Sequence, residues 1–243
     1  RNAHLQHTCV FGAMPYGGEA QDHLRLKELN LKPYLFERNG KLQLVYAGAM
    51  LPKAYEPLES IFKAVAASPE LFVNVEFYFI GTGKHANDPL SFNIKPLAAK
   101  YGLWQSVVFE YPKRIPYLDV LIHLEAADAV FILGSTEPHY TPSKAYQGVL
   151  SGKPILAVLH KMSTAIEILQ TSNAGVVLGF EGEQDVHSIA EQWVHVWHNF
   201  ISFQKVFVPS QVKKEVFEQY SAKSVTALLV QLLQQNNQKI LMR

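Results

Sequence analysis

The segment from residue 135 to residue 144 holds the side chains of this sequence best suited to chemistry. Thr141 and Ser143 place two hydroxyl groups shortly before Lys144, and His139 stands in the same loop. Hydroxyl groups, a lysine ammonium and free backbone N–H groups at the start of a helix are donors that bind phosphate. The segment therefore predicts a site for a phosphorylated ligand. His139 either hydrogen-bonds a sugar or phosphate there or packs within the loop.

A strand–helix–strand unit is expected to position this segment. The apolar stretch Ala129–Leu133 predicts a strand, and a second strand starts at Ile155. Between them we expect a helix from Thr141 to Gly152, with Thr141 as its N-cap and Pro142 in its first turn. The helix would then begin at the carboxyl end of a strand, where parallel α/β sheets bind ligands.

Three further loops are predicted at the same edge of the sheet. The first holds Gly48 and Lys53, the second Gly81, and the third Tyr111 and Arg114. Glycine lets a backbone approach a ligand closely, and lysine neutralises phosphate as a point charge. For each loop alone, the alternative is that the glycines only allow turns and the lysines only face solvent. Their convergence favours a ligand site.

Apolar runs alternate with segments of helical periodicity from about residue 41. The expected strands are 42–47, 75–80, 107–110, 129–133, a strand beginning at 155, and 175–179. The expected helices are 58–67, 93–101, 116–127, 141–152, 164–169 and 185–203. This alternation predicts a Rossmann-like α/β fold, a doubly wound parallel sheet with helices on both faces.

The two ends of the chain do not follow this alternation. Residues 1–40 look irregular, residues 41–210 form the expected Rossmann-like domain, and residues 211–243 follow the break at Pro209. A final helix is expected over 211–235, with an apolar face. That face either packs on the same domain or meets a domain outside this sequence.

Composition narrows the class of protein. The chain has 243 residues, 48% of them hydrophobic and 18% charged, which predicts a globular protein. A net charge of +1 argues against a nucleic-acid surface. One cysteine, Cys9, excludes an internal disulfide, and with no signal peptide or membrane span we expect a cytoplasmic location. The start at Arg1, without methionine, indicates a piece of a longer protein.

Two other patterns are weak. Gly81-x-Gly83-x-x-Ala86 matches the dinucleotide-binding fingerprint, but residues 87–89 are Asn-Asp-Pro, where a helix should begin. His195 and His198 lie one helical turn apart, but no activating motif accompanies them, so a surface helix is expected rather than a metal site. We therefore predict no metal and no cofactor.

The stretch Pro142–Pro154, PSKAYQGVLSGKP, resembles a stretch of the retaining glycosyltransferases with the GT-B fold, as in the GT4 group. Shorter matches agree in order: Pro15–Gly18, Tyr46–Gly48, Phe79–Gly83, Glu125–Ala129 and Phe217–Ser221. The resemblance implies the carboxyl-terminal, donor-binding domain of such an enzyme. The donor would be a nucleoside diphosphate sugar of unknown base, and the acceptor would bind the other half of the enzyme. Any peripheral contact with a membrane would also be made by that half.

The resemblance also implies roles for particular residues. Groups for the donor phosphates would be Gly48, Lys53, Thr141, Ser143 and Lys144; groups for the nucleoside would be Gly81, Tyr111, Arg114 and Gln147. Glu137 or His139 would lie near the transferred sugar as the catalytic group. The leaving phosphate would be stabilised by fixed donors, and the anomeric configuration would be retained.

The sequence departs from the family pattern at three places. Gln147 stands where a glutamate normally binds the ribose hydroxyl groups. The usual spacing from that position falls on His139, and Glu137 is the nearest acid, so the two remain alternatives. Ala49 and Met50 stand where an arginine usually follows the glycine. Two other interpretations therefore remain: a non-catalytic nucleotide-binding module, and another sugar-nucleotide enzyme such as an epimerase-like protein.

Overall fold

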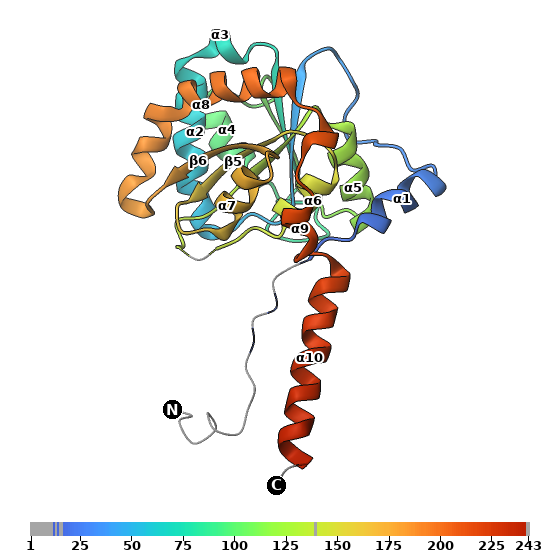
Figure 1. The fold of residues 1–243 in the computed structure, drawn as a ribbon. Helices are drawn as coiled ribbons and strands as arrows, with labels where there is room; N and C mark the ends of the chain where they lie inside the picture. Colours follow the sequence, from blue (N-terminus) through green and yellow to red (C-terminus); the bar gives the residue numbers. More distant parts are fainter. Residues whose placement is uncertain (1–11, 13, 15–16, 139, 242–243) are drawn as a thin grey trace.

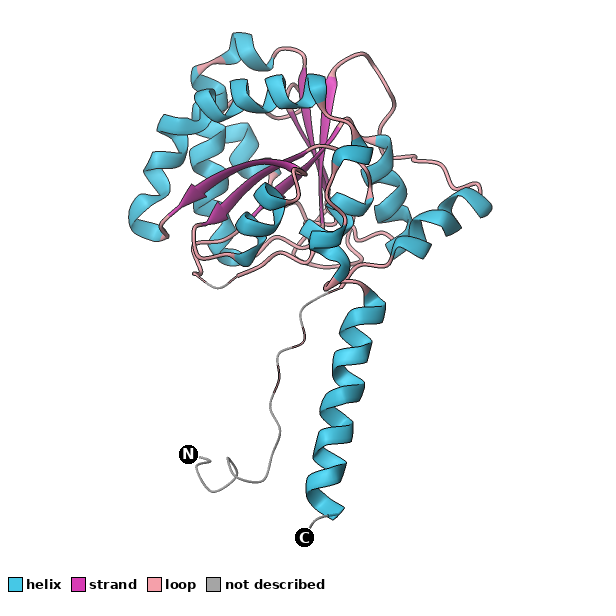
Figure 2. Ribbon diagram, viewed as in Figure 1, coloured by secondary structure: helices cyan, strands magenta, loops and turns pink. Residues whose placement is uncertain are grey.

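The computed structural model describes residues 12, 14, 17–138 and 140–241, which form a six-stranded sheet between two layers of helices (Figures 1 and 2). The strands are β1 (Leu42–Ala47), β2 (Val75–Ile80), β3 (Val108–Tyr111), β4 (Ala129–Leu133), β5 (Ile155–His160) and β6 (Gly175–Phe180). The expected doubly wound α/β fold is confirmed.

All six strands described run parallel, in the order β3-β2-β1-β4-β5-β6. The chain builds the sheet outward from β1 to β3 and then returns to place β4 on the other side of β1. The loops after β1 and β4 therefore leave in opposite directions. In open α/β sheets this switch point is where ligands bind.

Alternate residues of each strand point to opposite faces of the sheet, and each face carries its own helices. One layer contains α2 (Tyr55–Ala67), α3 (Pro69–Phe72), α4 (Lys95–Lys100) and α8 (Val186–Val206). The other contains α5 (Tyr117–Ala126), α6 (Lys144–Leu150), α7 (Thr164–Thr171) and α9 (Glu215–Glu218). Short 3-10 turns lie at Pro52–Ala54 (η2), Glu183–Asp185 (η3) and Pro209–Gln211 (η4).

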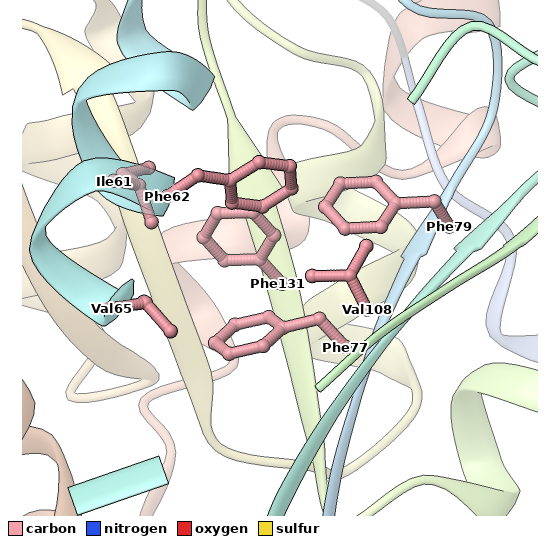
Figure 3. Close-up of a pocket in the computed structure, with 7 residues that line it drawn as sticks. All are labelled: Ile61, Phe62, Val65, Phe77, Phe79, Val108 and Phe131. Carbon is pink, nitrogen blue, oxygen red and sulfur yellow. The ribbon is translucent and has the colours of Figure 1, made fainter. Parts of the chain in front are cut away.

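An aromatic cluster fills the space between the sheet and α2 (Figure 3). Phe131 of β4 is 1% exposed and lies among Phe77, Phe79 and Trp193, with ring centroids 5.5, 6.2 and 6.5 Å away. The space left between these side chains is too small for a ligand. This cluster therefore holds the strands that position the loops, and it is not itself a binding site.

Both ends of the chain differ from the expectation. Residues 1–40 were expected to be irregular, but Ala20–Glu28 forms a helix, α1, in which the Glu19 side chain accepts a hydrogen bond from the Gln21 N–H. The prediction of a single helix over 211–235 is also wrong. The structure has η4, the short α9, and then a separate helix α10 (Ala222–Leu241).

Helix α10 extends away from the sheet and its helices (Figure 1). Its residues Leu229, Val230 and Leu233 are 38%, 44% and 56% exposed. The interpretation that this apolar face packs on the same domain is therefore wrong, and contact with another domain remains a prediction. No helix in the described part of the chain is both long and apolar enough to span a bilayer.

The start of α10 is fixed to the segment that precedes α1. The Gly18 N–H donates to the Tyr220 carbonyl at 2.9 Å, and the Ala222 N–H donates to the Gly18 carbonyl at 3.1 Å. This backbone pairing places Gly18 beside Ser221 in a parallel bridge. Segments about two hundred residues apart in sequence thus lie side by side here.

Candidate functional site

The side chain of Lys144 lies directly over Gly48, at the switch point between β1 and β4. A Cβ atom on Gly48 would stand 2.5 Å from Lys144 Cε and 3.2 Å from Nζ. Gly48 also has a φ of +126°, which only glycine adopts without strain. The structure therefore brings together two of the residues predicted to bind phosphate, one from each of the two diverging loops.

Lys144 has no counter-ion in the described part of the chain. Its Nζ is 4.9 Å from the centroid of the Tyr46 ring, and no carboxylate there lies within ion-pair distance. Burial lowers the pKa of Lys144 to about 8. A half-buried cation without an anion is partly desolvated. Its interaction with an incoming phosphate is therefore more favourable in free energy than that of an exposed lysine.

The loops after β2 and β3 reach the same place. The Gly81 N–H donates to the Tyr111 carbonyl at 2.7 Å. A Cβ on Gly81, where φ is +73°, would lie 3.7 Å from Arg114 Cα and 3.9 Å from Gly48 Cα. The structure therefore brings Gly48, Gly81, Arg114 and Lys144 together. The Tyr111 side chain instead packs in the layer of α5, where its ring is stacked 6.3 Å from that of Tyr78.

Lys53 is placed differently from Lys144. Its Nζ pairs with Glu183 of η3 at 3.3 Å, and both side chains are largely exposed. The Lys53 carbonyl accepts a hydrogen bond from the Thr136 N–H at 3.1 Å, which ties the loop after β1 to the loop after β4. The sequence predicts both Lys53 and Lys144 as phosphate-binding groups; of the two, Lys144 lies over Gly48, whereas Lys53 pairs with Glu183.

The predicted start of this helix is wrong by two residues, since the N-cap expected at Thr141 lies at Ser143. Helix α6 begins at Lys144, and Ser143 is its N-cap with no side-chain capping bond. The Ala145 N–H bonds to the Pro142 carbonyl, so tighter i→i+3 turns precede the helix. The Thr141 hydroxyl bonds that of Thr164 at 2.8 Å, which fixes the loop to α7 instead. The predicted helix end is confirmed, since Gly152 has a φ of +70°.

The catalytic alternatives lie in the loop between β4 and α6. Glu137 is exposed, and its backbone N–H donates to Ser135 Oγ at 3.3 Å. Its side chain is therefore open to solvent. His139 lies outside the described residues, so the choice between Glu137 and His139 remains a prediction.

Gln147 lies on α6, one turn after Lys144. Its side chain hydrogen-bonds that of Tyr117, and the Tyr117 hydroxyl donates to Asp22 of α1 at 3.0 Å. Burial, followed by the bond to Asp22, raises the pKa of Tyr117 to about 12. Sequence reasoning missed this connection because Asp22 and Tyr117 lie far from Gln147 along the chain and carry no motif.

Glu110 of β3 holds the Gly81–Gly83 loop in place, a role that the sequence did not indicate. Its carboxylate accepts hydrogen bonds from the Thr82 hydroxyl at 2.7 Å and from the N–H groups of Asn93, Ile94 and Lys95 at 2.8 to 2.9 Å. It is 5% exposed. Glu110 thus joins this loop to the start of α4, which begins well after the loop, so the dinucleotide fingerprint is not met.

Replacing Glu110 with glutamine is expected to lower the free energy of unfolding by about 2 kcal/mol, because the amide turns an N–H₂ group toward N–H donors. Urea unfolding followed by circular dichroism measures this change. The matched control is Glu70→Gln at an exposed position of α3, which should leave stability unchanged. Equal stability of both variants would show that the Glu110 hydrogen bonds contribute little.

The two histidines considered for a metal site, His195 and His198, lie on α8. His195 Nε2 lies 3.0 Å from the side-chain nitrogen of Asn199. Within the described ranges, no three side chains of His, Cys, Asp or Glu are close enough together to hold a metal ion.

Solved structures share this fold over most of the chain. A glycosyltransferase from Rickettsia africae ESF-5 aligns over 92% of the chain and 56% of its own, with a TM-score of 0.60 and 10% identity. A UDP-forming α,α-trehalose-phosphate synthase from Burkholderia xenovorans aligns over 91% and 52%, with a TM-score of 0.62 and 13% identity. HepE of Anabaena in complex with UDP-glucose aligns over 90% and 56%, with a TM-score of 0.56 and 14% identity.

These likenesses show the fold and not the activity, because the sequences are so different. The chain spans about half the length of these proteins. No protein-family model and no curated protein sequence matches it. The predicted resemblance to glycosyltransferases is thus confirmed at the level of the fold.

Proposed function

We propose that the chain is the donor-binding part of a glycosyltransferase that uses a nucleoside diphosphate sugar. The observation that carries this proposal is Lys144, a half-buried cation without a counter-ion, placed over Gly48 where β1 and β4 diverge. A diphosphate at this point would supply the missing negative charge. The fold shared with glycosyltransferases, one of them in complex with UDP-glucose, supports the same assignment.

In this proposal, catalysis depends on charge that develops on the leaving phosphate. Lys144 is held in place before reaction, so it stabilises that charge without reorganisation. Arg114 lies close enough to Gly81 to border the nucleoside or the diphosphate. Lys53 would add a second cation if Glu183 released it. The sugar is transferred with retention of configuration, and Glu137 or His139 stands near it.

Gln147 takes the ribose-binding position in the same proposal. A glutamine amide can hydrogen-bond two hydroxyl groups, but it lacks the charge assistance of a carboxylate. Since Gln147 already bonds Tyr117, that pair would have to separate or share the ribose. We therefore expect modest donor affinity. The acceptor, in this proposal, binds a second half of the protein that these residues do not include.

Calorimetric titration with UDP, GDP and ADP in separate experiments tests the proposal. We expect one of the three to bind more tightly than the others and more tightly than inorganic phosphate. The reason is that, in this proposal, the site at the switch point contacts both the base and the diphosphate. Addition of the matching sugar nucleotide should displace it. If none of the three binds at millimolar concentration, the assignment to donor binding is overturned. Binding of all three equally would favour a module that recognises only phosphate.

A further inference from the structure

A cavity lies away from the switch point, between α1, the carboxyl end of α6, α9 and the first turn of α10. Its volume is about 900 Å³. Helix α6 contributes to both places: Lys144 lies over Gly48 at its first residue, whereas Val149 and Leu150 line this cavity at its end. The nucleotide-binding proposal makes no use of the cavity.

The inner wall of the cavity is apolar and aromatic. The rings of Tyr146 and Tyr220 lie 4.8 Å apart, and both residues line the cavity. Val149 and Phe217 are each 9% exposed, and Leu24 of α1 lines the cavity from the other side. A volume of this size with such a wall is typical of sites for small organic molecules.

The polar residues of the cavity leave an excess of positive charge. Its four lysines are Lys27, Lys153, Lys214 and Lys223. None of them has an ion-pair partner within 4.0 Å in the described ranges. Among the carboxylates of the cavity, Glu19 caps α1 and Glu125 pairs with His23 at 2.7 Å. Only Glu218 has neither role, so unpaired ammonium groups outnumber unpaired carboxylates.

Lys153 shows the same imbalance. Burial, followed by the charge of Arg38, lowers the pKa of Lys153, and the charges of Asp128 and Glu125 oppose this effect only in part. An anion in the cavity would favour the charged form of Lys153.

We propose that this cavity binds an amphiphilic organic anion, a phosphate or carboxylate attached to an apolar body. The apolar body lies against Tyr146, Val149 and Phe217, and the anionic group meets Lys153 and Lys214. Such a ligand would bridge the carboxyl end of α6 to α9.

Calorimetric titration of the chain with octyl phosphate and with octanoate tests the proposal below the concentrations at which these molecules form micelles. We expect both to bind at least about tenfold more tightly than octyltrimethylammonium, which has the same tail and the opposite charge. Inorganic phosphate should bind weakly. The two anions distinguish a preference for phosphate from one for carboxylate. If the cation binds as tightly as the anions, the proposal is overturned.

Two variants of the cavity test whether octyl phosphate binds there. The double substitution Lys153→Glu and Lys214→Glu should weaken octyl phosphate binding about tenfold or more. The control Lys63→Glu and Lys205→Glu, an equal charge change at exposed sites on α2 and α8, should leave it unchanged. Leu24→Trp, at a side chain 51% exposed, should fill the cavity without disturbing the core. Circular dichroism confirms that each variant folds. Unchanged binding in both cavity variants places the site elsewhere and overturns the proposal.

This proposal stands apart from donor binding. Saturation with a nucleoside diphosphate should not displace octyl phosphate, because the two sites use opposite ends of α6. Failure of either ligand to bind leaves the result for the other intact. Displacement of one by the other would instead show that the amphiphile occupies the switch point, which also overturns the inference.

Discussion

Substitution of Lys144 by methionine is expected to weaken nucleoside diphosphate binding by about one to two powers of ten. Methionine keeps most of the length of the side chain and removes the charge. Hydrogen bonds to charged groups contribute about 1.5–3 kcal/mol, which gives this range of affinity. Calorimetric titration measures the change, and Lys63→Met on α2 is the matched control. An affinity equal to that of the unsubstituted protein would show that the diphosphate does not lie over Gly48.

The pH dependence offers an independent check of the same residue. The pKa of Lys144 is lowered to about 8, so the side chain is charged at pH 7 and mostly neutral at pH 9. Because the charged form binds the anion, affinity should fall by up to about tenfold between these pH values. The Lys144→Met variant should lack this fall. A parallel fall in both proteins would assign the pH dependence to another group.

Replacement of Phe131 by alanine is expected to lower the free energy of unfolding by about 3–5 kcal/mol. Phe131 is 1% exposed and lies beside three other aromatic rings, from β2 and α8, so a cavity would remain between the sheet and its helices. Urea unfolding followed by tryptophan fluorescence measures the change.

Two further variants separate this loss of packing from a general effect of removing an aromatic ring. Phe131→Leu should lower the free energy of unfolding by less than Phe131→Ala does, since most of the side-chain volume is kept. Phe203→Ala, at a partly exposed position of α8, should cost less than Phe131→Ala. A small effect of Phe131→Ala would mean that the surrounding rings close the cavity, and that the core is less rigid than the close ring packing suggests.

The sheet could be predicted from the sequence because its strands are short apolar runs, and β1, β2, β4 and β5 are buried almost throughout. The expected bounds of β1, β2 and β4 agree with the structure. Helical periodicity between these runs then leaves a parallel sheet as the simplest arrangement. The short end elements were harder to predict. Helix α1 has a largely polar sequence, and the chain turns twice between Pro209 and Ala222 where a single helix was expected.

The site was predicted in part. The loops follow from the strand order, so the approach of Gly48, Gly81 and Arg114 could be expected. The directions of long side chains could not. Lys53 and Lys144 are equivalent as charges in the sequence, and only packing decides that one pairs with Glu183 while the other lies against Tyr46. The start of α6 was also missed, because the Thr141 hydroxyl bonds a residue of α7 rather than capping its own helix.

The pairing of Gly18 with Ser221 holds the first residues of α10 by two backbone hydrogen bonds. The helix has 20 residues, so its far end is roughly 30 Å from that pairing. A tilt of only about 10° at the base would therefore sweep the tip through about 5 Å. Small adjustments where two backbone hydrogen bonds meet would thus be amplified into displacements large enough to open or close a contact at the tip.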